Sequence, residues 1–228
     1  MVFGCIKHQS FKNGQLDHDR LFRLKRFSRF NLKFCKRRNK MATAIIVPGL
    51  SGRTGFLRFL TRNWEKEHGI KVEFFVVDWK NDASVFDAAI DPLIGKIAEL
   101  AYNKETIFLI GTSAGGSFVM NAFLNTSYYI DKCVNVCGRL KPDGHPSLDR
   151  VADGYPLFRE SVIRCERRLQ GLNPAQLGNV FTFSGWWDGR VPVESICVNG
   201  ATNVQLQSFG HFCNIFMAFL CMPFWLKS

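Results

Sequence analysis

The chain has 228 residues, 46% hydrophobic and 21% charged, which is enough apolar chain for one sizeable folded core. Its formal charge of +11 comes almost entirely from residues 1–40, which hold 12 Lys and Arg but only 2 Asp and Glu. The rest of the chain holds 18 basic and 17 acidic residues, so its charge gives no reason to predict nucleic-acid binding.

The first 40 residues form a basic extension unlike the rest of the chain. Between Leu21 and Phe34, Leu and Phe residues alternate with Lys and Arg at near-helical spacing. We weigh a disordered extension, an amphipathic targeting or membrane-surface segment, and translated sequence upstream of a start at Met41. Asp17 and Asp19 weigh against a transit peptide, because such peptides are poor in acids. We expect residues 1–40 to be dispensable for a domain spanning residues 41–228.

The cysteines and the chain ends indicate the compartment. The eight cysteines lack zinc-site spacing, and several lie in apolar runs, where free cysteine behaves as a small hydrophobe. Together with the absence of a signal-peptide h-region, this favours a reduced, cytoplasmic setting without metal or cofactor. The apolar stretch from His211 to Leu226 is short for a bilayer span and contains Pro223. We predict a core helix there, with an interfacial anchor as the alternative.

From Met41 onward, apolar runs of strand length alternate with helical patterns. Six strands are predicted, at Thr43–Val47, Val72–Val77, Thr106–Ile110, Ile130–Val136, Val180–Phe183 and Val204–Gln207. Two sets of residues each share a helical face: Phe56, Leu57, Leu60 and Trp64, and then Phe86, Ile90, Leu93, Ile97 and Leu100. Gly69 is predicted to end the first helix, and Asp91-Pro92 to begin the second. The pattern predicts an α/β/α sandwich with a mostly parallel six-stranded sheet.

The stretch IFLIGTSAGGSF, from Ile107 to Phe118, passes directly from a strand pattern into a helix pattern. Ser113 is the central residue of a G-x-S-x-G motif between Gly111 and Gly115. Glycines are needed there because a direct strand-to-helix turn brings the residues flanking the corner close together. This context is typical of a nucleophile elbow, in which the serine is held under strain. An ordinary Gly/Ser-rich turn is the alternative.

A serine hydroxyl needs a base to take its proton. His211 follows the last strand pattern and directly precedes the last helix, so we predict that it is this base. His145, in the loop DGHP, is the second candidate. His68 ends a helical pattern and is interpreted as a polar cap.

The base in turn needs a carboxylate to orient it. Asp188 follows the fifth strand in the stretch WWDGRVP, and we predict that it holds the imidazole and stabilises the imidazolium. Asp-Gly is also a common turn pair, which is the alternative interpretation. Asp143, after the fourth strand, is the fallback acid.

Attack of a serine on a carbonyl group places negative charge on the carbonyl oxygen, and backbone N–H groups are predicted to stabilise this oxyanion. One belongs to Ala114, directly after the serine, and the other to Leu50 in the loop VPGLSGR. Gly49 and Gly52 allow that loop to approach a substrate closely, although a simple helix-entry turn has the same sequence signature.

Aromatic side chains flank these loops. They are interpreted either as the lining of an apolar acyl pocket or as core residues: Phe56, Trp186, Trp187 and Phe212.

From Met41 to its end the chain resembles the α/β-hydrolase superfamily, specifically its small members with a minimal sheet. The resemblance rests on VPGLSG as the oxyanion loop, GTSAG as the elbow, WWDGRVP as the acid loop and SFGHF as the histidine loop. It implies a triad of Ser113, Asp188 and His211. It also implies the strand order 2-1-3-4-5-6 and a small cap insertion at residues 138–178, with LFRESVIRCERRLQGL as its candidate helix.

The sequence therefore predicts a serine hydrolase that cleaves carboxylic esters or thioesters through an acyl-enzyme intermediate. GTSAGG also resembles the elbow of patatin-like lipases, which use a Ser-Asp dyad. The sequence separation between glycine-rich loop and elbow weighs against that alternative, as does the lack of a role for His211. A non-catalytic binding protein on the same fold is the other alternative. The expected partner is a small-molecule ester or acyl substrate, with no nucleic acid and no stable membrane span.

Overall fold

The computed structural model describes residues 41–142 and 154–227 of the chain. The predictions made for residues 1–40, Asp143 and His145 lie outside the described residues.

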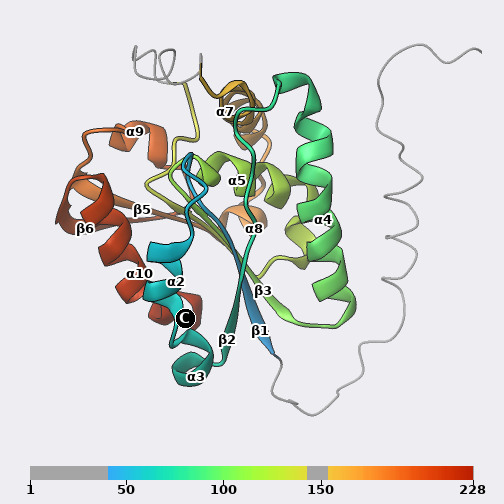
Figure 1. The fold of residues 1–228 in the computed structure, drawn as a ribbon, viewed down its shortest axis with the longest axis vertical. Coiled ribbons are helices and arrows are strands. Elements are labelled where there is room, and N and C mark those ends of the chain that lie inside the picture. The colour runs from blue at the N-terminus through green and yellow to red at the C-terminus, as the bar shows by residue number, and fades with distance from the viewer. Residues whose placement is uncertain (1–40, 143–153, 228) are drawn as a thin grey trace, which may run out of the picture. The chain divides into compact units, whose positions relative to one another are not determined.

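Six parallel strands form one sheet in the order β2-β1-β3-β4-β5-β6 (Figure 1). The strands are β1 (Ala42–Val47), β2 (Ile70–Phe74), β3 (Thr106–Thr112), β4 (Lys132–Val136), β5 (Val180–Trp187) and β6 (Thr202–Phe209). The α/β class and the strand order predicted from the sequence are confirmed. Because every pair is parallel, the carboxyl ends of the strands share one edge of the sheet.

Helices cover both faces of this sheet (Figure 1). One layer holds α4 (Phe86–Tyr102), α5 (Gly115–Thr126) and α7 (Pro156–Leu169), and the other holds α2 (Gly55–Thr61), α3 (Trp64–His68) and α10 (His211–Lys227). Connections contain η2 (Ala83–Val85), η3 (Ser127–Tyr129), α8 (Pro174–Leu177) and α9 (Val193–Ile196).

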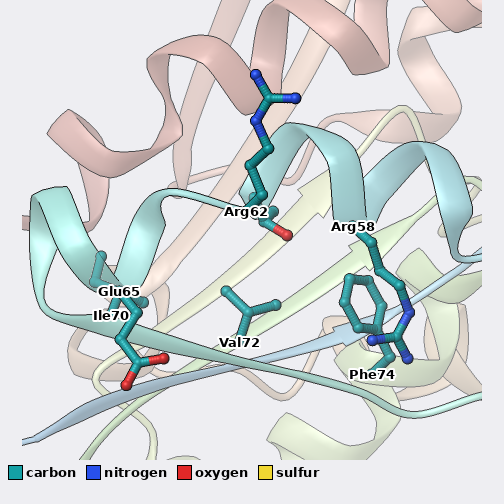
Figure 2. Close-up of a pocket in the computed structure, with 7 residues that line it drawn as sticks. Arg58, Arg62, Glu65, Ile70, Val72 and Phe74 are labelled. Carbon is teal, nitrogen blue, oxygen red and sulfur yellow. The ribbon is translucent and has the colours of Figure 1, made fainter.

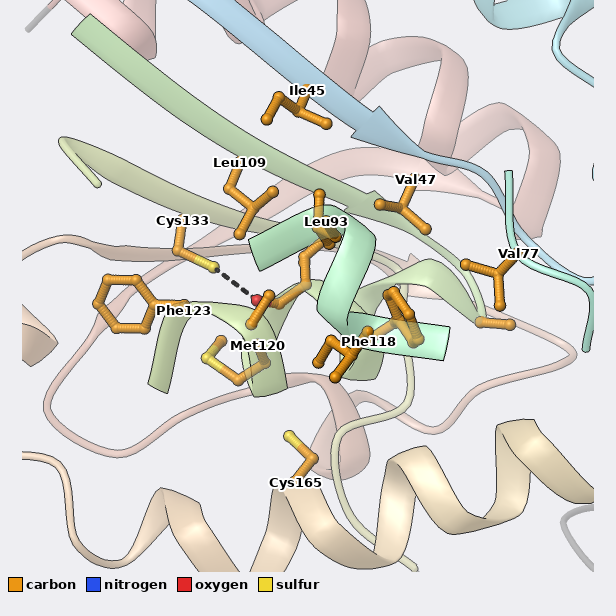
Figure 3. Close-up of a cluster of buried hydrophobic side chains, with 14 of the residues drawn as sticks. Ile45, Val47, Val77, Leu93, Leu109, Phe118, Met120, Phe123, Cys133 and Cys165 are labelled. Atoms are coloured by element: carbon orange, nitrogen blue, oxygen red, sulfur yellow. Dashed lines mark hydrogen bonds between the residues drawn. The ribbon is translucent and has the colours of Figure 1, made fainter. Parts of the chain in front are cut away.

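The two faces of the sheet bury separate hydrophobic clusters, because side chains alternate between faces along a strand. Ile45 and Leu109 contribute to the cluster with α4, α5 and α7, which Figure 3 shows, whereas Ile46 and Ile110 contribute to the cluster with α2, α3 and α10. The predicted three-layer arrangement is therefore confirmed.

The second predicted helix is present, but its predicted start is wrong. All five residues assigned to its inner face are buried. The helix begins at Phe86, so Pro92 lies inside it and Asp91 is no cap. The start lies earlier because Asp82 caps the preceding 3-10 turn, its side chain accepting from the N–H of Ser84 at 2.8 Å. That turn leads directly into α4.

The first predicted helix is divided into α2 and α3. Leu57 and Trp64 are buried as expected, but Phe56, placed on the same face, is exposed. Two turn residues, 62 and 63, separate α2 from α3, so the predicted helical face does not run through as one element. Gly69 ends α3 as predicted, with φ of 67° and its N–H donating to the Glu65 carbonyl at 3.0 Å.

Residues 138–178, the predicted cap insertion, contain α7 and α8 together with residues 143–153, which lie outside the described part. α7 packs on α5, where the hydroxyls of Ser161 and Ser117 are 2.8 Å apart and the Asn121 amide donates to the Ser161 carbonyl. The candidate cap helix thus turns its inner side to the core, and the existence of a cap stays a prediction.

The last helix, α10, continues through Pro223 and buries one side against the sheet, including Ile215, Phe219 and Met222. Its other side is exposed. None of the helices among residues 41–142 and 154–227 is long and apolar enough to cross a membrane.

Candidate functional site

Ser113 occupies the turn between β3 and α5, at the carboxyl edge of the sheet. Its φ is 53°, in the left-handed region that a residue with a side chain rarely adopts. The turn is tight: a Cβ on Gly111 would collide with the carbonyl of Gly115, and one on Gly115 with the carbonyl of Val47. The N–H of Ser113 donates to Val136 in β4 at 2.9 Å. Sheet and helix thus hold the strained serine in place.

Ser113, His211 and Asp188 form one hydrogen-bonded chain. The Oγ of Ser113 lies 3.0 Å from Nε2 of His211, and Nδ1 of His211 lies 2.8 Å from Oδ2 of Asp188. An ionised carboxylate only accepts hydrogen bonds, so Nδ1 carries the ring proton. In the neutral ring Nε2 is then left to accept from the serine hydroxyl.

The carboxylate of Asp188 is buried and fully engaged. Its Oδ1 accepts from the backbone N–H groups of Arg190 and Val191 at 2.9 and 3.1 Å. Burial alone would raise the pKa of Asp188, but the hydrogen bond and charge of His211 and these two N–H groups outweigh it, so the pKa is lowered from its ordinary value. Asp188 is therefore held in its ionised form beside the imidazole.

Asn214, which the sequence reasoning missed, is a fourth member of this network. Its Nδ2 donates to Oδ2 of Asp188 at 3.3 Å and to the carbonyl of Trp187 at 3.1 Å. Its Oδ1 accepts from the hydroxyl of Ser208 at 2.7 Å, and the residue is wholly buried. The available signal was an amide side chain three residues after His211, which places it on nearly the same side of the helix.

The loop after β1 lies against Ser113. A Cβ added to Gly49 would approach the Cβ of Ser113 to 3.0 Å and its Oγ to 3.3 Å, so a side chain at this position would crowd the serine. The indole of Trp79 donates to the Gly49 carbonyl at 3.2 Å and fixes the loop. Gly49 and Ser113 are thus close together, and the predicted oxyanion donors Leu50 and Ala114 are the next residue after each of them. Neither N–H donates to a backbone carbonyl in the described part of the chain.

The four aromatic residues named from the sequence are all exposed, so none is a core residue. Phe56 stacks on Phe216 of α10 with ring centroids 6.4 Å apart. Phe212 lies edge-on to the ring of His211, with centroids 6.1 Å apart. Trp186 packs edge-on against Phe209. The ring of Trp187 occupies the space where a side chain on Gly189 would lie.

The thiol of Cys137 lies close enough to Asp188 to be affected by its charge, but it is not prepared as a nucleophile. Burial and then the neighbouring carboxylate of Asp188 raise the pKa of its thiol well above the usual range. It therefore remains a neutral thiol, whereas the thiolate is the reactive form of cysteine.

A hollow of about 190 Å³ lies elsewhere, between α2, α3 and the edge strand β2 (Figure 2). Its lining residues include Arg58, Glu65 and Phe74, and none of the predicted site residues.

Comparisons with known proteins establish the fold. No protein-family model matches the sequence, and the search of curated proteins found no match. The structure is similar to a solved structure from a study of LipS and LipT, two metagenome-derived lipolytic enzymes. The TM-score is 0.61, with 12% identity over 82% of this chain and 94% of the other. The structure is also similar to the Bacillus licheniformis lipase BlEst2, with a TM-score of 0.60 and 16% identity over 84% and 93%.

A third similar structure is an alpha/beta hydrolase superfamily protein from Enterococcus faecalis, with a TM-score of 0.53 and 13% identity over 83% of this chain and 92% of the other. Each match spans most of both chains, which agrees with the sheet order and the two helical layers described above. The chain therefore has the α/β-hydrolase fold.

Proposed function

We propose that the protein is a serine hydrolase that cleaves carboxylic esters or thioesters. The observation that carries the proposal is the hydrogen-bonded chain from Ser113 through His211 to Asp188, with Ser113 at positive φ on a strand-to-helix turn. The similar structures described as a lipase and as lipolytic enzymes support the same class of reaction.

In the first half of the reaction, Oγ of Ser113 attacks the carbonyl carbon while Nε2 of His211 accepts the hydroxyl proton. His211 then donates this proton to the leaving alcohol or thiol as its bond to the acyl carbon breaks. In the second half, His211 takes a proton from water, the resulting hydroxide attacks acyl-Ser113, and the proton returns to Ser113 as the free acid leaves. Asp188 stays ionised throughout and stabilises the imidazolium.

The backbone N–H groups of Leu50 and Ala114 are proposed to donate to the oxyanion of the tetrahedral intermediate. Their support is the contact between Gly49 and Ser113, which brings the loop after β1 to the serine. Donors fixed by backbone need no reorganisation as charge develops on the oxygen. Phe56, Trp186, Trp187 and Phe212 are proposed to contact the acyl group, because they are exposed apolar residues of the surrounding loops and helices.

Labelling with a fluorophosphonate probe tests the proposal, because the probe reacts covalently with an activated serine. The wild type is expected to label, and Ser113→Ala and His211→Ala are expected to lose labelling. Ser84→Ala and His68→Ala are the matched controls, since Ser84 is an exposed residue of η2 and His68 lies at the end of α3. A wild type that does not label would overturn the proposal.

The same variants separate the two alternatives. A patatin-like Ser-Asp enzyme would keep its labelling in His211→Ala, but here His211 stands between Asp188 and Ser113, which favours the three-residue arrangement. A binding protein on this fold would label in none of the variants. For a labelled wild type, a series of p-nitrophenyl esters and acyl thioesters then measures the preferred leaving group and chain length.

A further inference from the structure

The outer face of α10 is an exposed surface made almost entirely of apolar side chains. We use this name for its exposed residues between positions 212 and 224: Phe212, Cys213, Phe216, Met217, Leu220 and Phe224. Successive members are one, three or four residues apart, so they lie along one side of the helix. The solvent side of a surface helix ordinarily carries charged and polar residues. Here it carries none until Lys227.

The neighbouring helix α2 extends this apolar surface. Its Phe56 stacks on Phe216 of α10, and its Phe59 is also exposed. Figure 1 shows α2 and α10 on the same side of the sheet. Contiguous exposed apolar patches of this kind mark an interaction site, whereas single exposed apolar residues are ordinary.

Arginines border the patch and lie on its rings. The guanidinium of Arg62 is 4.2 Å from the centroid of Phe59, and that of Arg190 is 5.1 Å from the centroid of Phe212. Arg58 lies over Phe74 at 4.6 Å, and Figure 2 shows Arg62 extending away from the hollow.

Neither α2 nor α10 contains Asp or Glu. The adjacent helix α3 carries Glu65 and Glu67 on either side of Lys66, and Glu65 lines the hollow with Arg58 and Arg62. Asp188 is buried and engaged with His211. With three arginines and no acid on α2 or α10, the rim of the patch carries an excess of positive charge.

We propose that this surface docks the protein on an anionic phospholipid bilayer, with α10 lying in the plane of the interface. An aromatic and aliphatic face bordered by arginines matches an interfacial helix, whose rings enter the acyl boundary while its cations meet lipid phosphates. The inference goes beyond the proposed reaction and does not depend on it.

The charge of the patch decides against the two other occupants. A second copy placed face to face would oppose Arg58, Arg62 and Arg190 with the same arginines and bring no acid from either helix. The N-terminal extension has apolar residues of suitable spacing, but residues 1–40 carry a net charge of +10 and would be repelled by the same rim. Of these three occupants, only an anionic bilayer supplies both an apolar interior and opposite charge.

The chain contains its own reporter for this docking. Cys213 is exposed on the outer face of α10, whereas the other described cysteines are buried or half-buried. Burial raises the pKa of the Cys197 and Cys221 thiols, which slows their alkylation. In a full-length chain with Cys5→Ser and Cys35→Ser, an environment-sensitive NBD fluorophore on Cys213 therefore reports on this face. The control carries the dye on Tyr128→Cys in a chain that also has Cys213→Ser.

The experiment titrates the labelled chain with vesicles of phosphatidylcholine containing 30% phosphatidylserine. Emission from the Cys213 dye is expected to shift to the blue and gain intensity, and emission from residue 128 to stay unchanged. The basic extension is present in both chains, so attachment through it alone would leave both dyes in water. That result, or no vesicle binding, would overturn the proposal. So would a blue shift that depends on protein concentration without vesicles, which would indicate a second copy.

Variants of the patch test which of its residues contribute to vesicle binding. Met217→Gln, Leu220→Gln and Phe224→Gln together are expected to reduce vesicle partitioning by about tenfold or more, because apolar surface no longer enters the acyl boundary. The matched control is Val85→Gln, Tyr102→Gln and Tyr128→Gln, three exposed apolar residues outside the patch, for which no change is expected. The double variant Arg58→Gln and Arg62→Gln is expected to weaken vesicle partitioning by about tenfold at low salt and by less at high salt.

Equal loss of partitioning in the patch variants and the control variants would contradict the proposal. Ser113→Ala should bind vesicles as the wild type does, which separates this test from that of the reaction.

Discussion

Helices α4 and α10 have the same length, but the solvent-facing side of α4 is charged and that of α10 is apolar. Each has 17 residues, contains an internal proline and buries one side against the sheet, α4 on one face and α10 on the other. The outer side of α4 is charged: Asp87 pairs with Arg164 at 2.6 Å, and Lys96 with Glu73 at 3.0 Å. The outer side of α10 carries rings and aliphatic chains.

The buried inner face is what the two helices share in joining the fold, since only α4 adds ion pairs from its outer side to neighbouring elements. Burial of apolar surface stabilises each helix on the sheet, whatever its outer side carries. The outer side is then available for another role, and on α10 it lies directly beside the ring of His211.

The largest expected difference between the helices is in catalysis. α10 supplies His211, whereas α4 supplies none of the proposed catalytic residues. His211→Ala is expected to lower kcat/KM for ester hydrolysis by about 10⁴-fold or more, because Ser113 loses its base. Asp91→Ala, at an exposed position of α4, should leave kcat/KM within about twofold. Steady-state kinetics on a p-nitrophenyl ester measure both, and a loss of less than tenfold in His211→Ala would contradict the assignment.

The inner faces are expected to respond alike. Leu93 on α4 and Phe219 on α10 are both almost completely buried. Leu93→Ala and Phe219→Ala should each lower the free energy of unfolding by about 3–5 kcal/mol, because each leaves a cavity in a packed cluster. Urea denaturation followed by circular dichroism measures the change. A much smaller loss in Phe219→Ala would mean that α10 is only loosely attached to the sheet.

Periodicity predicted the inner face of α4 correctly, because buried side chains must recur every three or four residues. It could not predict where α4 begins. That depends on the local cap formed by Asp82, and Asp91-Pro92 offers an equally good capping sequence. Likewise, the helical spacing from Phe56 to Trp64 predicts one continuous helix and does not reveal the break between α2 and α3.

The candidate site was predictable where short motifs carry it. GTSAG, WWDGRVP and SFGHF contain Ser113, Asp188 and His211, which the structure brings into hydrogen-bond contact. Asn214 lies in no such motif. Its importance arises from contacts with Trp187 and Asp188, which are distant in sequence. Nor does hydrophobicity alone tell an exposed ring from a buried one, so Phe212 and Phe219 look equivalent in the sequence although only Phe212 is exposed.

Asn214 provides an intermediate effect within α10. Asn214→Leu removes the donor to Asp188 while keeping a similar volume, and kcat is expected to fall by about tenfold with little change in KM. Without that hydrogen bond the carboxylate is less stabilised, so the pKa of Asp188 rises and it holds the His211 imidazolium more strongly. The acid limb of the profile of kcat/KM against pH should therefore move to higher pH. A reduced rate with an unmoved profile would indicate a merely structural role.

Asp188 also links stability to pH. Its pKa is lowered in the folded protein, so its ionised form stabilises the fold at pH values above the ordinary Asp pKa of about 3.9. That contribution is lost as pH falls through the lower, folded-state pKa. The difference in unfolding free energy between wild type and Asp188→Asn should therefore shrink below about pH 4. A difference that stays constant down to the acid transition would contradict the assigned charge state.

The smallest effects are expected on the outer faces. Phe224→Gln on α10 and Asp91→Leu on α4 should each change the free energy of unfolding by no more than about 0.5 kcal/mol, because both positions face water in the free protein. Urea denaturation without lipid measures this. If Phe224→Gln alone destabilised the protein by more than about 1 kcal/mol, Phe224 would have to be covered in the free state, and the outer face of α10 would be an interface between copies. If both changes are small, the ring of Phe224 contributes little to folding, as expected of a residue that meets a partner outside the chain.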